Sequence, residues 1–511
     1  MCGLFFTRNA KLGADKLTAL TAMLHHRGPD AQGVSAHREF FLGSVRLAIL
    51  DLNPRANQPF FSHSRKHVIT YNGEIFNYRE LAAKYSLALR TSCDTELIIE
   101  LFERRGEAML NELNGMFAFV ILNLETGAVF AARDRLGVKP LYIYEENGTL
   151  ALASELAPLL ELAGDAAIDD MGLRQYRKLR TFFNSRTLYK KIRFFPAAHF
   201  YKNGQFNRFW QLPLHDKEPP SDDALAELVK SAVAYRMISD VAVGCTLSGG
   251  LDSSIVTKLA APADTWSVGL PDSNEFSWAK VVADTMPVTH HDIVIDEADF
   301  LATAKEMILK RREPLSVPNE VLLYTLSRAA REKNKVVLCG EGADELFFGY
   351  DRIFRWAAEQ HTFDVADFDK HYSYGKNPDP EILEEALAPF IKAYKKPIDI
   401  VAAFFQIAHL HGLLRRLDNS SMMASVEMRA PFVDYRLVEA MAGVRFDYKM
   451  KNGVVKAPLK RIFGSLLPRP IVTRPKVGFP VPLARLFHCP EDRAFEAWTD
   501  FNLTTLGLRS G

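Results

Sequence analysis

Between residues 241 and 338, short apolar strands alternate with helices, and this alternation constrains the fold more than any other sequence feature. Strands are predicted at residues 241–247, 265–269, 291–295 and 335–338, and helices at 277–286, 296–311 and 320–333. Strands that alternate with helices are typical of a parallel α/β sheet. From about residue 376 onward, helical patterns broken by prolines predict a helical C-terminal part.

The first 210 residues have a different organisation. Short strands (residues 68–71 and 117–122 among them) are interspersed with a few helices such as 95–105, and residues 47–50 form another apolar strand after Arg46. This is an α+β pattern. Three prolines and alternating charges make residues 211–222 a predicted linker, within which Ser221 can cap the next helix. We therefore predict two domains, residues 2–210 and 223–511.

The composition argues against several classes of protein. Lys plus Arg total 63 and Asp plus Glu total 62, a net charge of +1, which does not support nucleic-acid binding. The longest apolar run, residues 116–122, is far shorter than the roughly 20 residues of a membrane helix. Five scattered cysteines without a CxxC pair predict neither a disulfide framework nor a zinc site. We expect a cytoplasmic enzyme.

Two loops at predicted strand ends carry candidate phosphate-binding residues. The first, LSGGLDSS at residues 247–254, is rich in small residues and opens a helix, so its backbone can approach phosphates closely. It is not a Walker A loop, because it lacks Gly-Lys-Ser/Thr. The second, residues 338–350, contains Glu341 and Asp344. Such loops converge at one sheet edge, so Asp252 and Asp344 are candidate Mg²⁺ ligands; helix capping explains the second loop equally well.

Cys2 would become the N-terminal residue if Met1 were removed. The free amine, with a pKa of about 7.7–8, could then take the thiol proton without a histidine partner. Asn72 and Gly73 are adjacent, and a side-chain amide beside a backbone N–H can form an oxyanion hole. Asp94 stands at a predicted helix start, where it can bind a substrate amine or cap the helix. Taken singly, each feature also has a purely structural explanation.

Taken together, the motifs of residues 2–155 resemble the class-II glutamine amidotransferase domain, an N-terminal-nucleophile hydrolase. In chain order they are MCG, HRGPD, RLAILD, YNGEIFN, SCDTE, GMFAF, ARDRLGVKPLY and ASE. The resemblance implies an αββα sandwich in which Cys2 attacks the side-chain amide of glutamine, with Arg46 on the glutamine carboxylate and Asp94 on its amine. It implies an oxyanion hole at Asn72 and Gly73. The implied glutamine pocket comprises Arg46, Leu47, Ala48, Ile49, Leu50, Asn72, Gly73, Glu74 and Asp94.

The second half resembles the asparagine synthetase domain, a relative of the N-type ATP pyrophosphatases. The resemblance rests on SGGLDSS, the GEGADE loop, residues 418–423 and 426–434, Lys456 and residues 474–479. It implies Mg²⁺ at Asp252 and Asp344 and an acid/base role for Glu341. Cys339 departs from the family, which usually has serine there. The implied ATP site comprises Leu247, Ser248, Gly249, Gly250, Asp252, Ser253, Ser254, Val268, Cys339, Gly340 and Lys456.

Together the resemblances imply a glutamine-dependent amidotransferase that uses ATP and Mg²⁺ to form an acyl-adenylate and then replaces AMP with ammonia. Ammonia must pass between the two sites, which implies an apolar tunnel. Aspartate is the leading acceptor, and another carboxylate, such as a sugar uronate or a peptide carboxylate, is the alternative. Two further alternatives stay open: that the protein forms a homodimer, and that it is a regulatory homologue without catalytic activity. Neither nucleic acid nor a membrane is an expected partner.

Residues 313–324 resemble the acceptor-side loop and helix start of the same family. Pro318 donates no hydrogen bond there, and Glu320 would repel a second acceptor carboxylate if it faced the pocket. Alternatively, Asn319 caps the helix and Glu320 lies in its first turn, stabilised by the helix dipole. The hydroxyls of a uronate could instead hydrogen-bond Asn319 and Glu320.

Overall fold

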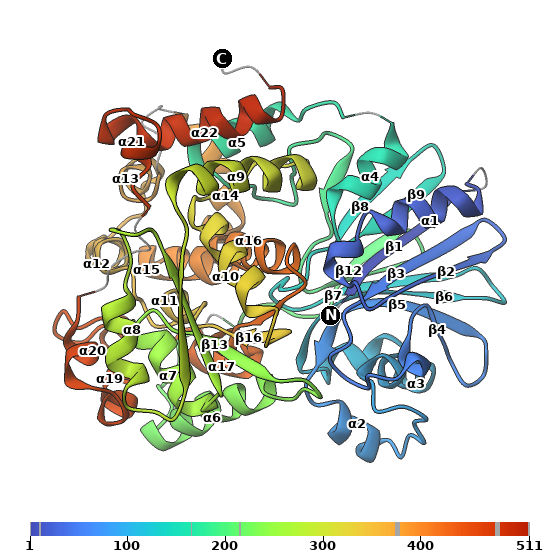
Figure 1. The fold of residues 1–511 in the computed structure, drawn as a ribbon, viewed down its shortest axis with the longest axis horizontal. Coiled ribbons are helices and arrows are strands. Elements are labelled where there is room, and N and C mark those ends of the chain that lie inside the picture. The colour runs from blue at the N-terminus through green and yellow to red at the C-terminus, as the bar shows by residue number, and fades with distance from the viewer. Residues whose placement is uncertain are drawn as a thin grey trace.

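The computed structural model describes residues 2–9, 12–164, 166–213, 216–373, 379–475 and 481–508. The N-terminal strands lie on one side of the molecule, and a parallel sheet with the C-terminal helices lies on the other (Figure 1). The last strand of the first part ends at Arg208, and the first helix of the second part begins at Asp222. The domain boundaries at residues 210 and 223 stay a prediction.

Two six-stranded antiparallel sheets form the N-terminal part. The first has the order β10-β8-β9-β1-β3-β2, and the second has the order β12-β11-β7-β6-β5-β4. The strands of the first sheet are β1 (Cys2–Arg8), β2 (Ala31–His37), β3 (Phe40–Arg46), β8 (Tyr142–Glu146), β9 (Thr149–Ala153) and β10 (Ile192–Phe194). Those of the second are β4 (Phe60–Phe61), β5 (His67–Ile75), β6 (Gly115–Asn123), β7 (Val129–Arg133), β11 (His199–Lys202) and β12 (Gln205–Arg208).

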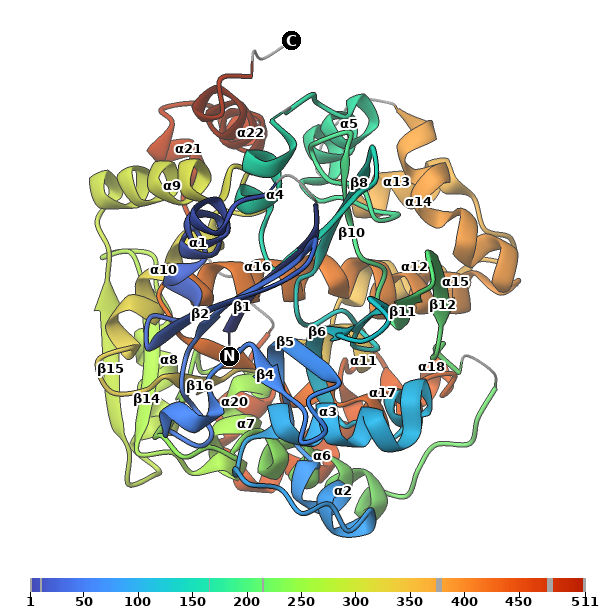
Figure 2. The ribbon, with the colours of Figure 1, turned by 90° about the vertical axis from the view of Figure 1, so that its right-hand side faces the viewer.

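The two sheets pack face to face between helices. Leu4, Phe6, Leu42, Val68 and Val120 are fully buried in the core between the sheets, which alternating apolar residues supply. The first sheet is covered by α1 (Ala14–Ala22) and α4 (Leu156–Ala163), and the second by α2 (Tyr78–Lys84) and α3 (Asp94–Arg105). Figure 2 shows the layers in this order. The predicted α+β, αββα architecture is confirmed, but the predicted strand at residues 47–50 is wrong, because β3 ends at Arg46 and a loop follows.

The second part is built on a parallel sheet with the order β15-β14-β13-β16-β17. All four predicted strands are present, as β13 (Val243–Thr246), β14 (Asp264–Gly269), β15 (Thr289–Val294) and β16 (Val336–Leu338). The sequence did not indicate β17 (Glu427–Arg429), which has one apolar residue in three. The helices around the sheet are α6 (Asp222–Arg236), α7 (Leu251–Ala260), α8 (Phe276–Ala283), α9 (Glu297–Arg311) and α10 (Asn319–Ala330).

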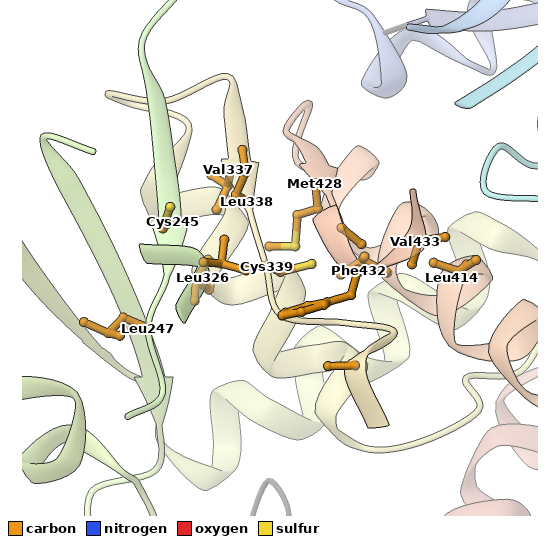
Figure 3. Close-up of a cluster of buried hydrophobic side chains, with 14 of the residues drawn as sticks. Cys245, Leu247, Leu326, Val337, Leu338, Cys339, Leu414, Met428, Phe432 and Val433 are labelled. Atoms are coloured by element: carbon orange, nitrogen blue, oxygen red, sulfur yellow. The ribbon is translucent and has the colours of Figure 1, made fainter. Parts of the chain in front are cut away.

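The centre of this sheet is a dense apolar core. Figure 3 shows Cys245 of β13 near Val337 and Leu338 of β16, with Met428 of β17 and Phe432 close by. The predicted cap of α6 is confirmed, because the Ser221 hydroxyl accepts a hydrogen bond from the backbone N–H of Ala224 at 3.2 Å. The packed core fixes β13 and β16 side by side, and the loops that follow them therefore open at the same edge.

Helices dominate from residue 343 onward, so the helical part predicted from about residue 376 is present and begins earlier in the chain. The main ones are α11 (Ala343–Leu346), α12 (Asp351–Glu359), α13 (Val365–Tyr372), α14 (Pro380–Ala393), α15 (Pro397–Phe404), α16 (Leu410–Met422), α17 (Tyr435–Met441), α18 (Phe446–Lys449), α19 (Ala457–Phe463), α20 (Arg469–Thr473), α21 (Leu483–Leu486) and α22 (Ala494–Thr505). A π-helical turn, Phe405–His409, joins α15 to α16. Within the described chain, this joined stretch is long and apolar enough to span a bilayer, but more than half of its most apolar window is buried in the protein, as expected of a core helix.

A buried ionic centre on α16 joins the two parts. Asp418 accepts hydrogen bonds from Arg27 at 2.7 Å and from Lys139 at 3.1 Å. Arg27 also donates to Glu155 at 3.0 Å, and burial of Glu155 is outweighed by His26 and Arg27, which hold its pKa well below the usual range. All four paired side chains are at least nine-tenths buried. The centre therefore depends on complete pairing of its charges.

We predict that Asp418→Ala destabilises the protein strongly. It would leave Arg27 and Lys139 buried without their shared counter-charge, and breaking a buried pair in this way costs about 3–5 kcal/mol of unfolding free energy. The measurement is the apparent melting temperature by circular dichroism. The control is Asp284→Ala, which breaks an exposed pair with Lys280 and should have little effect. Equal melting temperatures for the two variants would contradict the prediction.

Candidate active sites

The first candidate site forms where the two antiparallel sheets meet. Cys2 begins β1 and lies opposite Arg46 of β3, while Asn72 and Gly73 belong to β5 of the other sheet. The backbone N–H of Cys2 donates to Asn72 Oδ1 at 3.3 Å. The structure thus brings together the residues that the N-terminal motifs single out.

The Cys2 thiol is held among polar groups inside the protein. Burial raises the pKa of the Cys2 thiol, and the charge of Arg46 and a backbone hydrogen bond from Leu47 oppose that effect. Gln58 Nε2 lies 3.6 Å from Cys2 Sγ, and Gln58 Oε1 accepts the Tyr71 backbone N–H at 2.6 Å. The sequence analysis missed Gln58, which lies outside every quoted motif and has no neighbouring signal.

An unsatisfied donor lies beside the thiol. Among the described residues, the buried Nδ2 of Asn72 has no hydrogen-bond partner. A Cβ on Gly73 would overlap the Met116 carbonyl oxygen and lie 2.8 Å from Phe117 Cα, so the backbone of β6 leaves no room for a side chain there. A buried free amide donor is costly to maintain and is available to an oxygen of a bound molecule.

Two buried carboxylates complete this site. Asp94 begins α3, but the helix has no side-chain cap, so the capping alternative is wrong. Asp94 Oδ2 instead accepts the Tyr71 hydroxyl at 2.7 Å and the Ile75 backbone N–H at 2.8 Å. Glu74 Oε2 lies 3.5 Å from an Arg429 nitrogen. Burial raises the pKa of Asp94, and burial together with the charge of Asp94 raises the pKa of Glu74 well above its usual range.

Arg46 shapes the loop that follows it. Its guanidinium donates to the Leu50 carbonyl oxygen at 2.9 Å, to the Asp51 carbonyl oxygen at 2.5 Å and to Asn57 Oδ1 at 2.9 Å. The segment that follows Arg46 therefore forms a buried loop instead of a strand. It consists of Leu47, Ala48, Ile49 and Leu50. This loop presents its backbone next to Cys2, since Leu47 already bonds the thiol.

The second candidate site is a pocket of about 270 Å³ beyond the carboxyl ends of β13, β14 and β16. Most of the predicted ATP and acid residues line it, namely Leu247, Ser248, Gly250, Asp252, Ser253, Val268, Cys339, Gly340, Glu341, Asp344 and Lys456. Gly249 and Ser254 are not lining residues: Gly249, at a φ of +69°, packs against Trp278, and Ser254 is buried in α7. The sequence analysis missed other lining residues, including Trp266, Glu275, Leu323, Leu417 and Lys460.

Hydrogen bonds hold the first loop in shape at the start of α7. Ser248 Oγ and Ser253 Oγ are 3.1 Å apart, and Ser253 Oγ also donates to the Gly250 carbonyl oxygen at 3.2 Å. Gly340 of the second loop lies against this turn, since a Cβ there would be 2.8 Å from the Ser253 nitrogen. The two loops therefore touch, and the start of α7 faces the pocket with the charge preference of a helix N-terminus for anions.

Lys456 lies between the two predicted acids. Its Nζ is paired with Asp252 and with Asp344, the latter at 2.7 Å. Burial opposes protonation, but the two carboxylates outweigh burial and raise the pKa of Lys456 above its usual range.

No cluster of three or more metal-binding side chains occurs in the described ranges. Two carboxylates suit Mg²⁺, which usually completes its shell with substrate phosphates and water.

The acceptor-side residues contradict the first sequence hypothesis and bear out only one part of the second. Glu320 is fully buried, with Arg311 donating to one carboxylate oxygen at 2.6 Å and the Ser316 N–H donating to the other at 2.5 Å. Repulsion of an acceptor by Glu320 is therefore wrong, because Arg311 neutralises it. The N-cap of α10 is Pro318 without a side-chain cap bond, so capping by Asn319 is also wrong. Glu320 does lie in the first turn.

Glu341 accepts a hydrogen bond from Arg416 of α16 at 3.2 Å. Elsewhere in the lining, Arg474 pairs with Glu275, and the guanidinium carbon of Arg474 lies 4.5 Å from the ring centre of Trp278. Of the motif at residues 474–479, only Arg474 and Pro475 belong to the described residues. The lining of the pocket thus contains the paired charges of Arg474 with Glu275 and of Lys456 with Asp252 and Asp344.

Comparisons with known proteins find matches to both parts of the chain. A family model described as asparagine synthase matches residues 224–500, and a glutamine amidotransferase domain model matches residues 1–210. Asparagine synthetase [glutamine-hydrolyzing] 1 of Bacillus subtilis is 28% identical, over 91% of this chain and 83% of the relative. Asparagine synthetase B of Escherichia coli is 28% identical, over 94% of this chain and 82% of the relative.

Among solved structures, a glutamine phosphoribosylpyrophosphate amidotransferase from B. subtilis matches with a TM-score of 0.33 and 17% identity, over 57% of this chain and 65% of that one. A likeness this low supports no conclusion. The asparagine synthase model alone covers more than half of the chain. This chain belongs to the asparagine synthase family of glutamine-dependent amidotransferase ligases.

Proposed function

We propose that this enzyme hydrolyses glutamine at Cys2 and uses the ammonia to amidate an ATP-activated carboxylate. The observation that carries the proposal is the pair of built sites on either side of α16. On one side, Asp418 holds Arg27, whose Nε bonds the Cys2 carbonyl oxygen at 3.3 Å. On the other side, the preceding residue, Leu417, lines the second pocket.

In the glutaminase step, Cys2 Sγ attacks the carbon of the glutamine side-chain amide. The free amine of a processed Cys2 takes the thiol proton and passes it to the leaving ammonia. The unsatisfied Asn72 Nδ2, with Gly73, receives the oxyanion. Asp94, Glu74, Arg46 and the Leu47–Leu50 backbone hold the rest of glutamine, and water then cleaves the thioester.

In the ligase step, an oxygen of the acceptor carboxylate attacks the α-phosphorus of ATP and pyrophosphate leaves. Mg²⁺, when bound, would lower the negative charge of the triphosphate, and Asp252 and Asp344 are placed to hold it. Lys456 lies between those acids and is placed to contact phosphate oxygens. Ammonia then attacks the acyl carbon, AMP leaves, and Glu341 is placed to accept the released proton.

The ammonia can travel through the protein interior. Leu47 and Ile49, in the loop beside Cys2, belong to the same apolar cluster as Leu338 and Met428 of the parallel sheet. Figure 3 shows the part of this cluster around Leu338 and Met428. Apolar surroundings disfavour the ammonium ion and so keep ammonia in its reactive neutral form. This continuity supports an internal passage between the sites.

We favour aspartate as the acceptor. We also favour a catalytically active enzyme over a regulatory homologue, and we place it in the cytoplasm. The relatives from B. subtilis and E. coli are named asparagine synthetases, and the neutralised Glu320 removes the charge that would oppose aspartate. One observation favours a hydroxyl-bearing carboxylate such as a uronate. Within the described chain, the buried Oδ1 of Asn319 has no partner, and it could accept a hydroxyl hydrogen bond.

We predict that Cys2→Ala abolishes glutaminase activity and glutamine-dependent synthesis but spares synthesis from added ammonium. The reason is that the thiol is the nucleophile of one site only. Glutamate and pyrophosphate release measure the two activities, and Cys489→Ala, a half-buried cysteine far from Cys2 in the sequence, is the control. Equal loss of both activities in a folded Cys2→Ala protein would refute the two-site proposal.

We predict that Gly349→Ala stops pyrophosphate release and leaves the glutaminase intact. A Cβ at residue 349 would overlap the Asp344 carboxylate and Lys456 Cε, so both would have to leave their present positions. We expect at least a tenfold loss of ATP-dependent turnover. The control is Gly464→Ala, where a Cβ meets only Val472 at 3.5 Å. Wild-type pyrophosphate release by Gly349→Ala would show that the acids do not act on ATP.

We predict that aspartate, ATP, Mg²⁺ and glutamine yield asparagine together with AMP and pyrophosphate. Parallel reactions with glucuronate and galacturonate test the alternative acceptor, and pyrophosphate release is the common measurement. Rapid turnover at modest aspartate concentration supports aspartate. Glutaminase activity without asparagine, accompanied by pyrophosphate release with a uronate, would favour the hydroxyl-bearing acceptor.

A further inference from the structure

A second pocket, of about 160 Å³, lies away from both candidate sites. It is bounded by α15, by α18 and by Phe348, which follows the short helix α11 that contains Asp344. Its walls are partly apolar and its charged groups are of both signs. The lining residues comprise the apolar Phe348, Ile398, Ala402, Val444 and Phe446, the bases Lys396, Arg445 and Lys449, and the acids Asp216 and Asp399.

Two opposite charges face this pocket without pairing. Lys449 is 1% exposed, and its Nζ lies 4.5 Å from the centre of the Phe348 ring. Among the described residues, neither Lys449 nor the Asp399 carboxylate makes an ion pair or hydrogen bond, whereas Lys396 and Asp216 at the rim pair with each other at 3.0 Å. Burial lowers the pKa of Lys449 to about 7 despite the nearby charge of Asp399, and burial raises the pKa of Asp399.

Unpaired charges in a low-dielectric pocket are costly, and a molecule that satisfied both would be bound favourably. A lone anion would neutralise Lys449 but would face the carboxylate of Asp399. A molecule with a carboxylate and an ammonium group would satisfy both. Cavities of about 150 Å³ accommodate benzene, so the volume suits a small molecule of that kind.

We propose that this pocket binds a small α-amino acid, with its carboxylate on Lys449, its ammonium group on Asp399 and a short side chain against Phe348 and Phe446. The pocket shares no lining residue with the proposed nucleotide pocket and contains none of the residues named above for glutamine or for the acceptor.

The pocket is connected to the loop of the proposed ATP site. Phe348 has a φ of +56°, a strained conformation for a bulky residue, and the adjoining Gly349 N–H donates to the Asp344 carbonyl oxygen at 2.8 Å. A ligand that pressed on the Phe348 ring would bear on Asp344 and Lys456. This coupling, unlike the binding itself, rests on the proposed function of the nucleotide pocket.

Ligand-observed NMR with L-alanine and L-serine tests the binding on the full-length enzyme. Propionate and ethylamine, which are alanine without its amine and without its carboxylate, are the matched probes. We expect at least one amino acid to bind, and both single-charge probes to bind at least tenfold more weakly. No binding of either amino acid, or propionate binding as tightly as alanine, would overturn the proposal.

Variants assign the binding to this pocket. Lys449→Met and Asp399→Asn should each weaken it at least tenfold, whereas Lys451→Met, at an exposed lysine two residues away, should leave it unchanged. Unchanged binding in a folded Lys449→Met protein would overturn the assignment. If neither variant folds, the test uses the wild-type protein. Alanine should protect Lys449 from reductive methylation, which mass spectrometry maps, and absence of this protection counts against the proposal.

The coupling between this pocket and the proposed ATP site is measured separately from the binding. Saturating alanine should change the KM for ATP at least twofold in wild type and not in Lys449→Met, while glutaminase activity stays constant. An unchanged KM would overturn the coupling but not the binding. If no acceptor supports pyrophosphate release, the proposed function fails, and the NMR result still decides whether the pocket binds an amino acid.

Discussion

The paired carboxylate of Asp418 is the interaction on which the arrangement of the two parts depends. It is buried where the sandwich meets α16, and it holds two cations from the sandwich, Arg27 and Lys139. Burying three charges is unfavourable unless each finds its partner, so the centre forms only when the two parts are correctly docked. Because Arg27 also bonds the Cys2 carbonyl oxygen, the same docking positions the start of β1.

Successive residues of α16 contact different parts of the protein. Side chains on an α-helix are separated by about 100°, so four neighbours in sequence point at four different surroundings. Arg416 donates to Glu341 and Leu417 lines the pocket of the second candidate site, whereas Asp418 bonds the sandwich and Asn419 donates to Glu313 at 2.9 Å. A rotation or shift of this helix would therefore disturb both sites together. That constraint explains why an apolar helix carries so many polar residues on its last two turns.

Sequence reasoning succeeded where the signal was local and failed where it depended on partners distant in the chain. Strand and helix alternation predicted β13 to β16, but Glu427–Arg429, with one apolar residue in three, has too little apolar character to be recognised as β17. Residues 47–50 have the composition of a strand, yet Arg46 bonds their carbonyl oxygens and forms a loop. The charge of Glu320 suggested repulsion of an acceptor carboxylate, because no sequence pattern shows that Arg311 pairs with it. Gln58 was missed because it contacts the site across strands.

The buried ion pairs between the sites also bear on how ammonia could remain a nucleophile. Ammonia that meets a neutral carboxylic acid becomes ammonium, which is retained by the resulting carboxylate and no longer attacks an acyl group. Burial would favour the neutral acid at Glu427, but Arg429 outweighs burial and lowers the pKa of Glu427, and Arg27 with His26 does the same for Glu155. Such carboxylates have no proton to give. Glu74 and Asp94, in the first site with Cys2, are exceptions, since burial raises the pKa of both. The pairing that locks the two parts together thus also keeps Glu155 and Glu427 ionised.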